Sequence, residues 1–532
     1  MIYTTVPAVR RSRPFWHLSP AEHSVWEAYP TGEWVDLRTG DRERDDPAGG
    51  GAWGPERTVR AEVLVALLLG MAPAEPGHTP GLRLAGARIT GALDLSDAEI
   101  TTKVHLLNCH LAETVDLTDS VTKGVRLRGC DLRRLRAGRC RIDGLLDLDG
   151  STVHQGMRLD NTHVTGQFRL SRARVSAPRP GGDGGGERHL RDIRAPYSGE
   201  ELKERGYVQD QWAVWAGGLS VDGGAFMRGL RATGGLRLIG TRFSGGLYLR
   251  EAVVKAIGTQ AVNGDHMETA SAEFSGGFSA EGTVRLRGAR IAGVLSFDKA
   301  TVKAPGRSLH LSHMQVDELI LTAEKIEGEV NLGYSRIGVL LDRPAVYPDA
   351  VHLNGTTYES LRGDWTVAER LKWVCRDPGG YRPQPYEQLA AWYRRIGHEP
   401  DARRVLVAKQ RERRGTLPAA GRGWGRLLDV MVGYGYRPWL AAGWAGLLLA
   451  VGTTAFSLVP PTKIDPEEVR AFQPFIYTLD LLAPVSVFEQ RAAWEPVGWT
   501  QWLAGVIIVA GWILATALIA GAARVLRPQS GS

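Results

Sequence analysis

The 532-residue chain has few cysteines and no long apolar run before residue 439. Its four cysteines are too few for the disulfide framework that is typical of small secreted folds. The N-terminus contains Arg10, Arg11 and Arg13 but lacks an apolar core of signal-peptide length. We therefore expect the N-terminal part to stay in the cytoplasm, with its thiols reduced.

The sequence also lacks the motifs that accompany common enzyme chemistry. It has no dinucleotide-binding fingerprint, no zinc-protease histidine pair and no phosphate-binding loop between a strand and a helix. The glycines at 181–186 lie in a charged, proline-containing stretch, without the strand and helix that a phosphate cradle requires. We therefore predict no catalytic residue, no cofactor and no metal, and an enzyme is the less favoured class.

The chain has instead a short sequence repeat, called the phrase below, that recurs about every eleven residues from Leu82 onward. Each copy has two apolar residues two positions apart, then a small residue, then another apolar residue. The step of two is strand alternation, and phrases this short must stack to bury their apolar face. The pattern predicts a mainly β fold, and resembles a right-handed, quadrilateral, pentapeptide-type β-helix with about 22 residues per coil.

Two features of the phrase have a chemical and a structural interpretation. Cys109, Cys130 and Cys140 occupy its small position, where a metal site or disulfide competes with simple packing. We favour packing, because free cysteine behaves as a small apolar residue. Asp94 and Asp116 are expected to stack outward in neighbouring coils, as paired catalytic carboxylates would. Arg136 and Arg158 continue that ladder, so we favour a charge-balanced surface.

Composition divides the chain into seven regions. They are an N-terminal helical cap (1–80), a first solenoid part (81–175), a charged Gly/Pro-rich insertion (176–213), a second solenoid part (214–358), a helical hairpin (359–415), a basic juxtamembrane segment (416–438) and a transmembrane hairpin (439–527) with an extracytoplasmic loop (460–500).

Helix signals occur on both sides of the solenoid. Ser19 followed by Pro20 predicts a helix start, and the apolar spacing over 56–69 predicts a second helix against the first coil. Gly397 separates two helices predicted at 385–396 and 400–414. This pair resembles one tetratricopeptide-type unit, and we favour a solenoid cap or stalk over a peptide-binding groove, because such repeats need neighbours.

Two uncharged segments near the C-terminus, 439–459 and 502–523, are long enough to cross a membrane as helices. Small residues such as Gly446 and Gly511 would let them approach closely. Residues 401–437 contain nine basic and three acidic side chains, whereas 460–500 contains three basic and six acidic ones. The positive-inside rule therefore predicts a two-pass cell-membrane protein with both termini cytoplasmic.

The membrane-interface residues that we predict are basic or tryptophan side chains near the two segments. They would contact anionic lipid headgroups at the cytoplasmic face or anchor the helix ends, and they are Arg411, Arg413, Arg414, Arg422, Arg426, Arg437, Trp439, Trp502, Arg524 and Arg527. Between the spans, residues 472–488 predict an interfacial helix. The sequence Met-Val-Gly-Tyr-Gly at 431–435 is similar to a potassium-channel filter, but it precedes the first span, so we favour a juxtamembrane turn.

The order of these parts resembles a family of actinobacterial membrane proteins. The resemblance rests on the coils that begin Gly81-Leu82-Arg83-Leu84, on Gln384 to Leu389, on Gly435-Tyr436-Arg437-Pro438-Trp439 and on Tyr477 to Asp480. Members often carry the automatic name membrane-associated oxidoreductase. The resemblance implies a membrane location and a pentapeptide-like helix, and it transfers no catalytic residue.

These observations favour a non-catalytic interaction scaffold or sensor whose solenoid presents a long patterned surface. One alternative is the oxidoreductase that the family name suggests, and another is an oligomeric channel or channel regulator built on the two spans. We expect the membrane and an unidentified protein as partners, but no nucleic acid. The sequence does not decide whether the protein forms a homo-oligomer. The segments 176–206 and 256–271, which break the phrase, are the places where we expect specificity.

Overall fold

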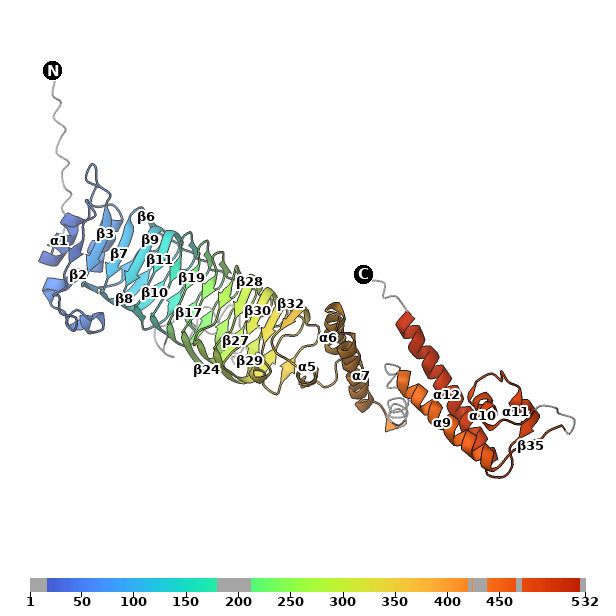
Figure 1. Ribbon diagram of the computed structural model, residues 1–532. Helices are drawn as coiled ribbons and strands as arrows, with labels where there is room; N and C mark the ends of the chain where they lie inside the picture. Colours follow the sequence, from blue (N-terminus) through green and yellow to red (C-terminus); the bar gives the residue numbers. More distant parts are fainter. Residues whose placement is uncertain (1–16, 179–211, 420–422, 424–437, 466–470, 527–532) are drawn as a thin grey trace, which may run out of the picture. The chain divides into compact units, whose positions relative to one another are not determined.

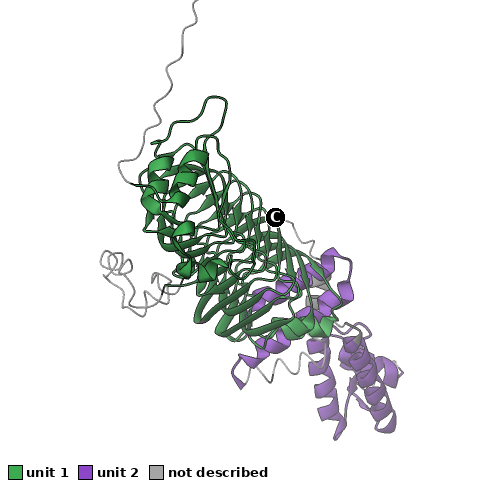
Figure 2. Ribbon diagram, turned by 90° about the vertical axis from the view of Figure 1, so that its left-hand side faces the viewer, with its two compact units in different colours: residues 1–380 green, residues 381–532 purple. Residues whose placement is uncertain are grey.

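The computed structural model describes residues 17–178, 212–419, 423, 438–465 and 471–526. The chain falls into two compact units, Met1–Gly380 and Tyr381–Ser532 (Figure 2). The first unit contains the solenoid, and the second contains the helices that follow it.

The first unit is a β-solenoid of about 11 turns of parallel strands, with helices at its ends (Figure 1). Along the chain, one or two strands of one sheet are followed by one or two strands of the other. Sheet 1 has 18 strands: β1 (Val35–Asp36), β3 (Gly81–Ala85), β6 (Glu99–Ile100), β7 (Lys103–Leu107), β9 (Val121–Arg128), β11 (Arg141–Asp147), β14 (His163–Val164), β15 (Phe168–Arg169), β18 (Ser220–Val221), β19 (Ala225–Phe226), β22 (Arg242–Phe243), β23 (Leu247–Tyr248), β25 (Glu268–Thr269), β26 (Ala272–Glu273), β28 (Arg290–Ser296), β30 (Gln315–Leu321), β32 (Arg336–Asp342) and β34 (Thr357–Arg362).

Sheet 2 has 16 strands and forms the other part of each turn. They are β2 (Thr58–Arg60), β4 (Arg88–Thr90), β5 (Leu93–Asp94), β8 (His110–Asp116), β10 (Asp131–Arg136), β12 (Thr152–Val153), β13 (Met157–Arg158), β16 (Arg174–Ser176), β17 (Trp212–Trp215), β20 (Arg231–Thr233), β21 (Gly235–Arg237), β24 (Val253–Asn263), β27 (Ser279–Arg285), β29 (Thr301–His310), β31 (Lys325–Asn331) and β33 (Val351–His352). The four short strands β12 to β15 together make one turn.

The recurring phrase sets the register of the turns. Leu84 pairs with Leu106, and Leu106 pairs with Leu127, so equivalent leucines of neighbouring turns stack on one another. All three side chains are buried, and each contributes about 1.5–3 kcal/mol of apolar burial. The corners adopt left-handed backbone at residues such as Asn108 and Asp119, whose φ angles are 50° and 59°. Asparagine and aspartate tolerate this conformation because their short side chains bond locally.

Cysteines fill small interior positions at these corners, as the packing interpretation predicts. Cys109 and Cys130 are buried in adjacent turns, and the Cys109 backbone N–H lies 3.4 Å from the Cys130 sulfur. The next position of that ladder is Ser151, whose hydroxyl accepts from the Cys130 N–H at 2.9 Å. Cys140 lies on the other ladder, 3.3 Å from the Ser120 hydroxyl. The thiols thus occupy the same positions as serines.

The N-terminal end of the solenoid is covered by helices and by added strands. Helix α1 (Pro20–Ala28) begins at the predicted Ser19, which forms a capping box with Glu22. The helix predicted at 56–69 is shorter: α2 spans Ala61–Leu68, and Thr58–Arg60 form strand β2, which pairs with β4. The β-branched Thr58 and Val59 suit a strand, and their pairing covers an otherwise open sheet edge. Two 3₁₀ helices precede β2, at Pro47–Ala52 and Pro55–Arg57.

The solenoid continues on both sides of the predicted insertion. Strands β16 and β17 flank it, and most of the insertion (179–211) lies outside the described residues. Strand β17 begins at Trp212, two residues before the predicted solenoid boundary. The predicted break at 256–271 is instead part of the solenoid, because β24 spans Val253–Asn263 and pairs in register, with bulges, with β27. A bulge accommodates extra residues without ending the ladder.

The C-terminal end of the solenoid is closed by the short helix α5 (Val367–Val374), which follows the 3₁₀ helix Pro344–Val346 and β34. Arg370 of α5 forms a buried ion pair with Asp342 of β32, with nitrogen–oxygen distances of 2.7 and 2.9 Å. The Tyr347 hydroxyl donates to the same carboxylate at 2.7 Å. Helix α5 packs on the last turns, and the hairpin that we expected as a cap or stalk belongs to the second unit.

The second unit begins with the predicted helical hairpin, α6 (Pro383–Arg395) and α7 (Glu399–Gly415). Gly397 between them has a φ of 82°, so the turn uses a conformation that favours glycine. Leu389 of α6 and Val405 of α7 are buried, as their spacing predicts. The remaining elements are α9 (Pro438–Leu458), β35 (Thr462–Lys463), α10 (Pro474–Leu482), α11 (Gln490–Ala493), β36 (Trp494–Glu495) and α12 (Thr500–Leu526).

Candidate functional site

Helix α9 is the candidate membrane-spanning helix. Its stretch Leu440–Leu458 is 19 residues long with a mean hydropathy of 1.5, and it is long and apolar enough to cross a membrane. In α12 the apolar stretch whose side chains are described, Thr500–Thr516, is shorter. Within the described residues, one helix therefore meets the length and composition of a membrane span.

Helix α10 joins α9 and α12 into one module. Phe456 of α9, Tyr477 and Leu481 of α10, and Ile507 of α12 form a buried apolar cluster. A side chain at Gly511 would overlap the Leu482 carbonyl oxygen, so the glycine allows α10 to lie against α12. We expected Gly511 to serve the contact between the two long helices, and its actual neighbour is α10.

The two long helices also touch directly, through residues other than those we predicted. Ala441 of α9 and Leu514 of α12 are buried together, and Ala445 and Leu448 pack against them. A side chain added at Gly446 would meet nothing within 4 Å, so the prediction that Gly446 mediates close approach is wrong. The alanines lie toward α12, and the glycine lies on a different face of α9.

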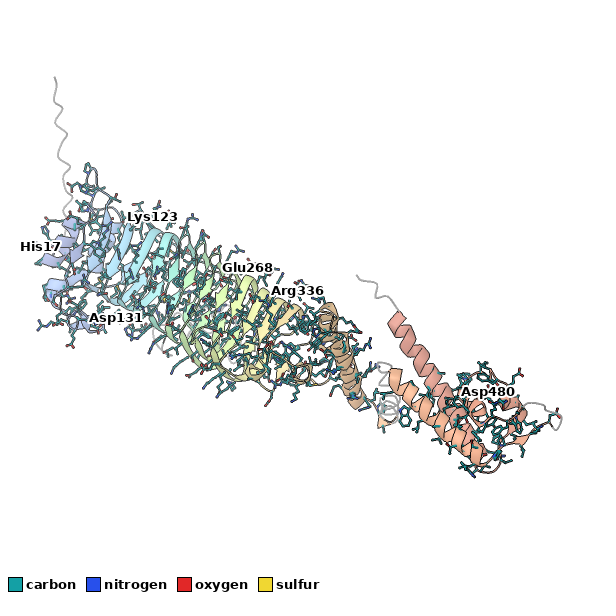
Figure 3. All side chains as sticks on the ribbon, viewed as in Figure 1. His17, Lys123, Asp131, Glu268, Arg336 and Asp480 are labelled. Atoms are coloured by element: carbon teal, nitrogen blue, oxygen red, sulfur yellow. The ribbon has the colours of Figure 1, made fainter. Side chains whose placement is uncertain are left out.

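Asp480 organises the segment after α10 (Figure 3). Its carboxylate is buried and accepts hydrogen bonds from the Ser486 hydroxyl (2.6 Å) and from the backbone N–H groups of Val487, Phe488 and Arg491 (2.9–3.0 Å). Burial raises the pKa of Asp480, but these hydrogen bonds outweigh burial and lower it below its usual value. The carboxylate is thus a structural anchor for the turn.

The outer surface of this module is apolar. On α12, Trp502 is 83% exposed, Val506 58% and Val509 60%, and these side chains help line a shallow groove of about 790 Å³ with Gly505 and Ile513. Other large apolar side chains are also exposed on α9, on α12 and on the connecting turn: Trp444, Leu447, Val451, Leu458, Val485, Val487, Phe488, Trp499 and Trp512. Exposed apolar side chains in such number are typical of a membrane or protein interaction site.

The predicted interface residues are only partly described. Arg411, Arg413 and Arg414 lie in the last turn and a half of α7, and Trp502 lies in the first turn of α12. Trp439 and Arg524 belong to α9 and α12, but their side chains lie outside the described residues. The other predicted interface residues lie entirely outside the described residues, and they are Arg422, Arg426, Arg437 and Arg527. The sequence at 431–435 also lies outside.

On the solenoid, the carboxylate pair that we considered for catalysis is stacked as predicted. Asp94 pairs in register with Asp116, and Arg136 and Arg158 continue the ladder. The Asp94 carboxylate accepts from the Ser96 hydroxyl at 2.7 Å, and Asp116 lies 3.7 Å from Arg136. Hydrogen bonds from Ser96 lower the pKa of Asp94. These partners agree with a charge-balanced surface.

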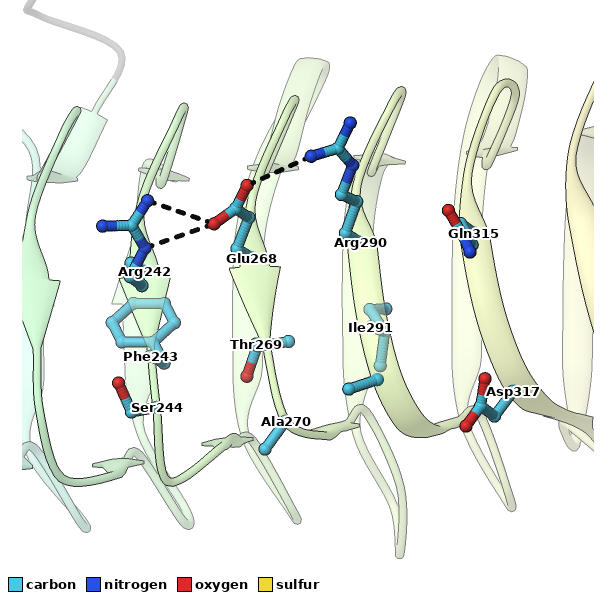
Figure 4. Close-up of a pocket in the computed structure, with 11 residues that line it drawn as sticks. Arg242, Phe243, Ser244, Glu268, Thr269, Ala270, Arg290, Ile291, Gln315 and Asp317 are labelled. Carbon is cyan, nitrogen blue, oxygen red and sulfur yellow. Dashed lines mark hydrogen bonds and ion pairs between the residues drawn. The ribbon is translucent and has the colours of Figure 1, made fainter.

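A second solenoid face carries a shallow pocket of about 570 Å³ (Figure 4). Glu268 lies between two arginines of neighbouring turns, 3.2 Å from Arg242 and 3.6 Å from Arg290. The small side chains Ser244 and Ala270 leave the hollow beneath them. The arginines already have a carboxylate partner, so this pocket offers shape but little unpaired charge. Figure 3 shows Lys123, Glu268 and Arg336 on this sheet 1 surface and Asp131 on sheet 2.

Among the described residues, no group of three or more His, Cys, Asp or Glu side chains is arranged to hold a metal ion. Comparison of the chain with protein-family models, with curated proteins and with solved structures found no match. Sequence reasoning missed the role of α10 as a buried link, because its alternative as a surface helix has the same apolar composition.

Proposed function

We propose that the protein is a two-pass membrane protein that holds a β-solenoid at the cytoplasmic face, where the solenoid acts as a non-catalytic interaction scaffold or sensor. The observation that carries the proposal is the exposed apolar surface of α9 and α12. Soluble monomers rarely expose so many large apolar side chains together. The 27 residues of α12 correspond to about 40 Å of helix, enough for a second span.

The details of the proposal follow from charge and repeat pattern. The basic residues before α9 and after α12 would contact anionic lipid headgroups, each gaining about 1 kcal/mol near the surface. Both termini would then be cytoplasmic. Turns built from four short strands, such as β12 to β15, favour the quadrilateral, right-handed cross-section of pentapeptide-type helices. Membership of the actinobacterial family that the chain resembles is part of this proposal. Outward ladders of alternating charge would serve as the binding surface.

Membrane retention of matched valine variants tests the anchor. Val509 of α12 is 60% exposed and Val121 of the solenoid is 45% exposed. We expect Val509→Arg to move a large fraction of the full-length protein into the carbonate-soluble fraction, because an arginine near the membrane centre costs about 2.5–3.5 kcal/mol. Val121→Arg should leave the protein in the membrane fraction. If carbonate released Val509→Arg and Val121→Arg to the same extent, the anchor would be refuted.

Truncation after Gly415 supplies the complementary test. The shortened chain keeps the solenoid and the α6–α7 hairpin but loses the apolar module. We expect it in the soluble fraction, with circular dichroism of a folded β protein. Retention of this fragment in the membrane fraction would show that the membrane contact lies elsewhere.

A further inference from the structure

The pocket between the N-terminal cap and the first turns differs from the rest of the solenoid surface. It has a volume of about 440 Å³ and is lined by Trp34 of the cap and by side chains of β3, β7, β9 and β11. Pockets that bind small molecules usually measure about 300–1,000 Å³. Its size therefore suits a small-molecule ligand.

The pocket gathers basic side chains that form no ion pair with any described residue. Arg83, Lys103 and Arg126 line it, and none of the three has a carboxylate oxygen within 4.0 Å among the residues that the structure describes. Arg83 stacks on His105, and His105 stacks on Arg126, in three successive turns. Neighbouring turns of a sheet are about 4.8 Å apart, so Arg83 and Arg126 carry like charges one turn on either side of His105, and an anion between them would reduce their repulsion.

Several basic side chains elsewhere on the solenoid pair with carboxylates of the neighbouring turn. Lys123 lies 2.6 Å from Asp143, Arg169 lies 2.8 Å from Asp149, and Arg285 lies 2.7 Å from Asp265. The one carboxylate that lines the pocket is Asp143, and it already pairs with Lys123. What distinguishes the pocket from these paired turns is that three basic side chains without a carboxylate partner in the described part of the chain line one hollow.

The walls of the pocket are shaped by two glycines and two rings. Gly124 and Gly144 lie in adjacent turns, and Gly144 has a φ of 139°, which other residues rarely adopt. The missing side chains leave the hollow. Trp34 meets His105 edge to face, with ring centroids 4.6 Å apart, and is itself 44% exposed. The exposed indole face can stack on a flat ligand ring.

His105 adapts to this environment by losing its charge. Burial, together with Arg126, Arg128 and Arg83, lowers the pKa of His105 to about 4. The imidazole is therefore neutral near pH 7, and its ring N–H is a donor that adds no further repulsion. The pocket thus combines two guanidinium groups, an ammonium group and a neutral donor.

We propose that this pocket binds the phosphate group of a small molecule, with a flat ring of that molecule stacked on Trp34. Arginine matches phosphate geometry with paired N–H groups, and Arg83 and Arg126 stand one turn on either side of His105. The site is independent of membrane anchoring, because all of its described residues belong to the first unit.

Calorimetry on the full-length protein tests the proposal, with adenosine 5′-monophosphate and glycerol phosphate as probes. We expect saturable binding of both, tighter for the nucleotide, and at least tenfold weaker binding of each probe to Arg83→Gln and Arg126→Gln. Arg336→Gln, an exposed arginine of the same sheet far along the solenoid, is the matched control and should bind both probes as the parent does.

The ring contact is tested separately with Trp34→Ala. We expect this variant to lose the preference for the nucleotide and to bind glycerol phosphate unchanged. Equal affinity of the parent protein for the two probes would refute the stacking role of Trp34. Absence of saturable binding, or an equal loss in Arg336→Gln, would overturn the site itself. All substituted side chains are exposed, and circular dichroism verifies that the variants fold.

Discussion

The ion pair between Arg370 and Asp342 is expected to hold the last solenoid turns closed. The two side chains are 2% and 0% exposed, and the guanidinium also lies 3.9 Å from the centre of the Trp365 ring. In Arg370→Ala, the Asp342 carboxylate loses the guanidinium group and keeps the hydrogen bond from the Tyr347 hydroxyl. Removing one partner of a buried pair costs about 3–5 kcal/mol, because the other charge stays buried.

The loss should be local, because each turn of a solenoid contacts only its neighbours. We expect amide hydrogen exchange to become roughly 100- to 4,000-fold faster in β32 and β34, from about 1.4 kcal/mol per tenfold change. Strands β9 and β11, many turns away, should exchange as in the parent protein. Hydrogen-exchange mass spectrometry on the full chain measures both regions in one experiment.

Two variants separate the charge from the general loss of a side chain. Arg336→Ala removes an exposed arginine from the same strand, β32, and should change exchange by less than about threefold. The double variant Arg370→Met with Asp342→Asn removes both charges and should recover most of the protection. Unchanged exchange in β34 of Arg370→Ala, or a uniform increase along all turns, would refute this account of the solenoid end.

Further predictions concern Asp480 and His310. In Asp480→Ala, three backbone N–H groups lose their acceptor at a cost of about 2–3 kcal/mol. We therefore expect protease to cleave the 483–491 segment faster in detergent. Unchanged cleavage would contradict the anchoring role. Burial and the nearby Arg285 and Arg307 lower the pKa of His310 to about 4 in the folded protein. The unfolded state therefore binds more protons below about pH 6.5, and stability falls as the pH drops towards 4. His310→Gln should reduce this fall by about 1 kcal/mol at pH 5 after allowance for solvent screening, and an unchanged pH profile of thermal unfolding would refute it.

The solenoid could be predicted because its determinants are local. Alternation at Leu82 and Leu84 sets the inward face, and the repeat length sets which residue stacks on which, so the Asp94–Asp116 ladder followed from spacing alone. The ends could not be predicted in the same way. Val59 has helical spacing with its successors, but it pairs with Ile89 as a strand, and that long-range pairing overrides local preference.

The pocket at His105 was missed for a related reason. Arg83, His105 and Arg126 are separated in sequence but stacked in space, and Trp34 approaches them from the cap. The outward positions of the phrase contained part of the signal, since basic residues recur there in three successive turns, but only the approach of Trp34 makes them a pocket. In the second unit, α10 could not be placed from composition, because burial against α9 and α12 and a location at a membrane surface require the same apolar residues.

Thiol accessibility in intact cells tests the two-pass anchor most directly. Cys375 is the exposed native cysteine of the first unit, whereas Cys109, Cys130 and Cys140 are buried. Thr462→Cys would add one exposed thiol in β35, between the two long helices. We predict that a membrane-impermeant maleimide labels this new thiol in intact cells and labels Cys375 only after permeabilisation. Labelling of Cys375 in intact cells, or labelling of both thiols only after permeabilisation, would contradict a cytoplasmic solenoid held by two spans.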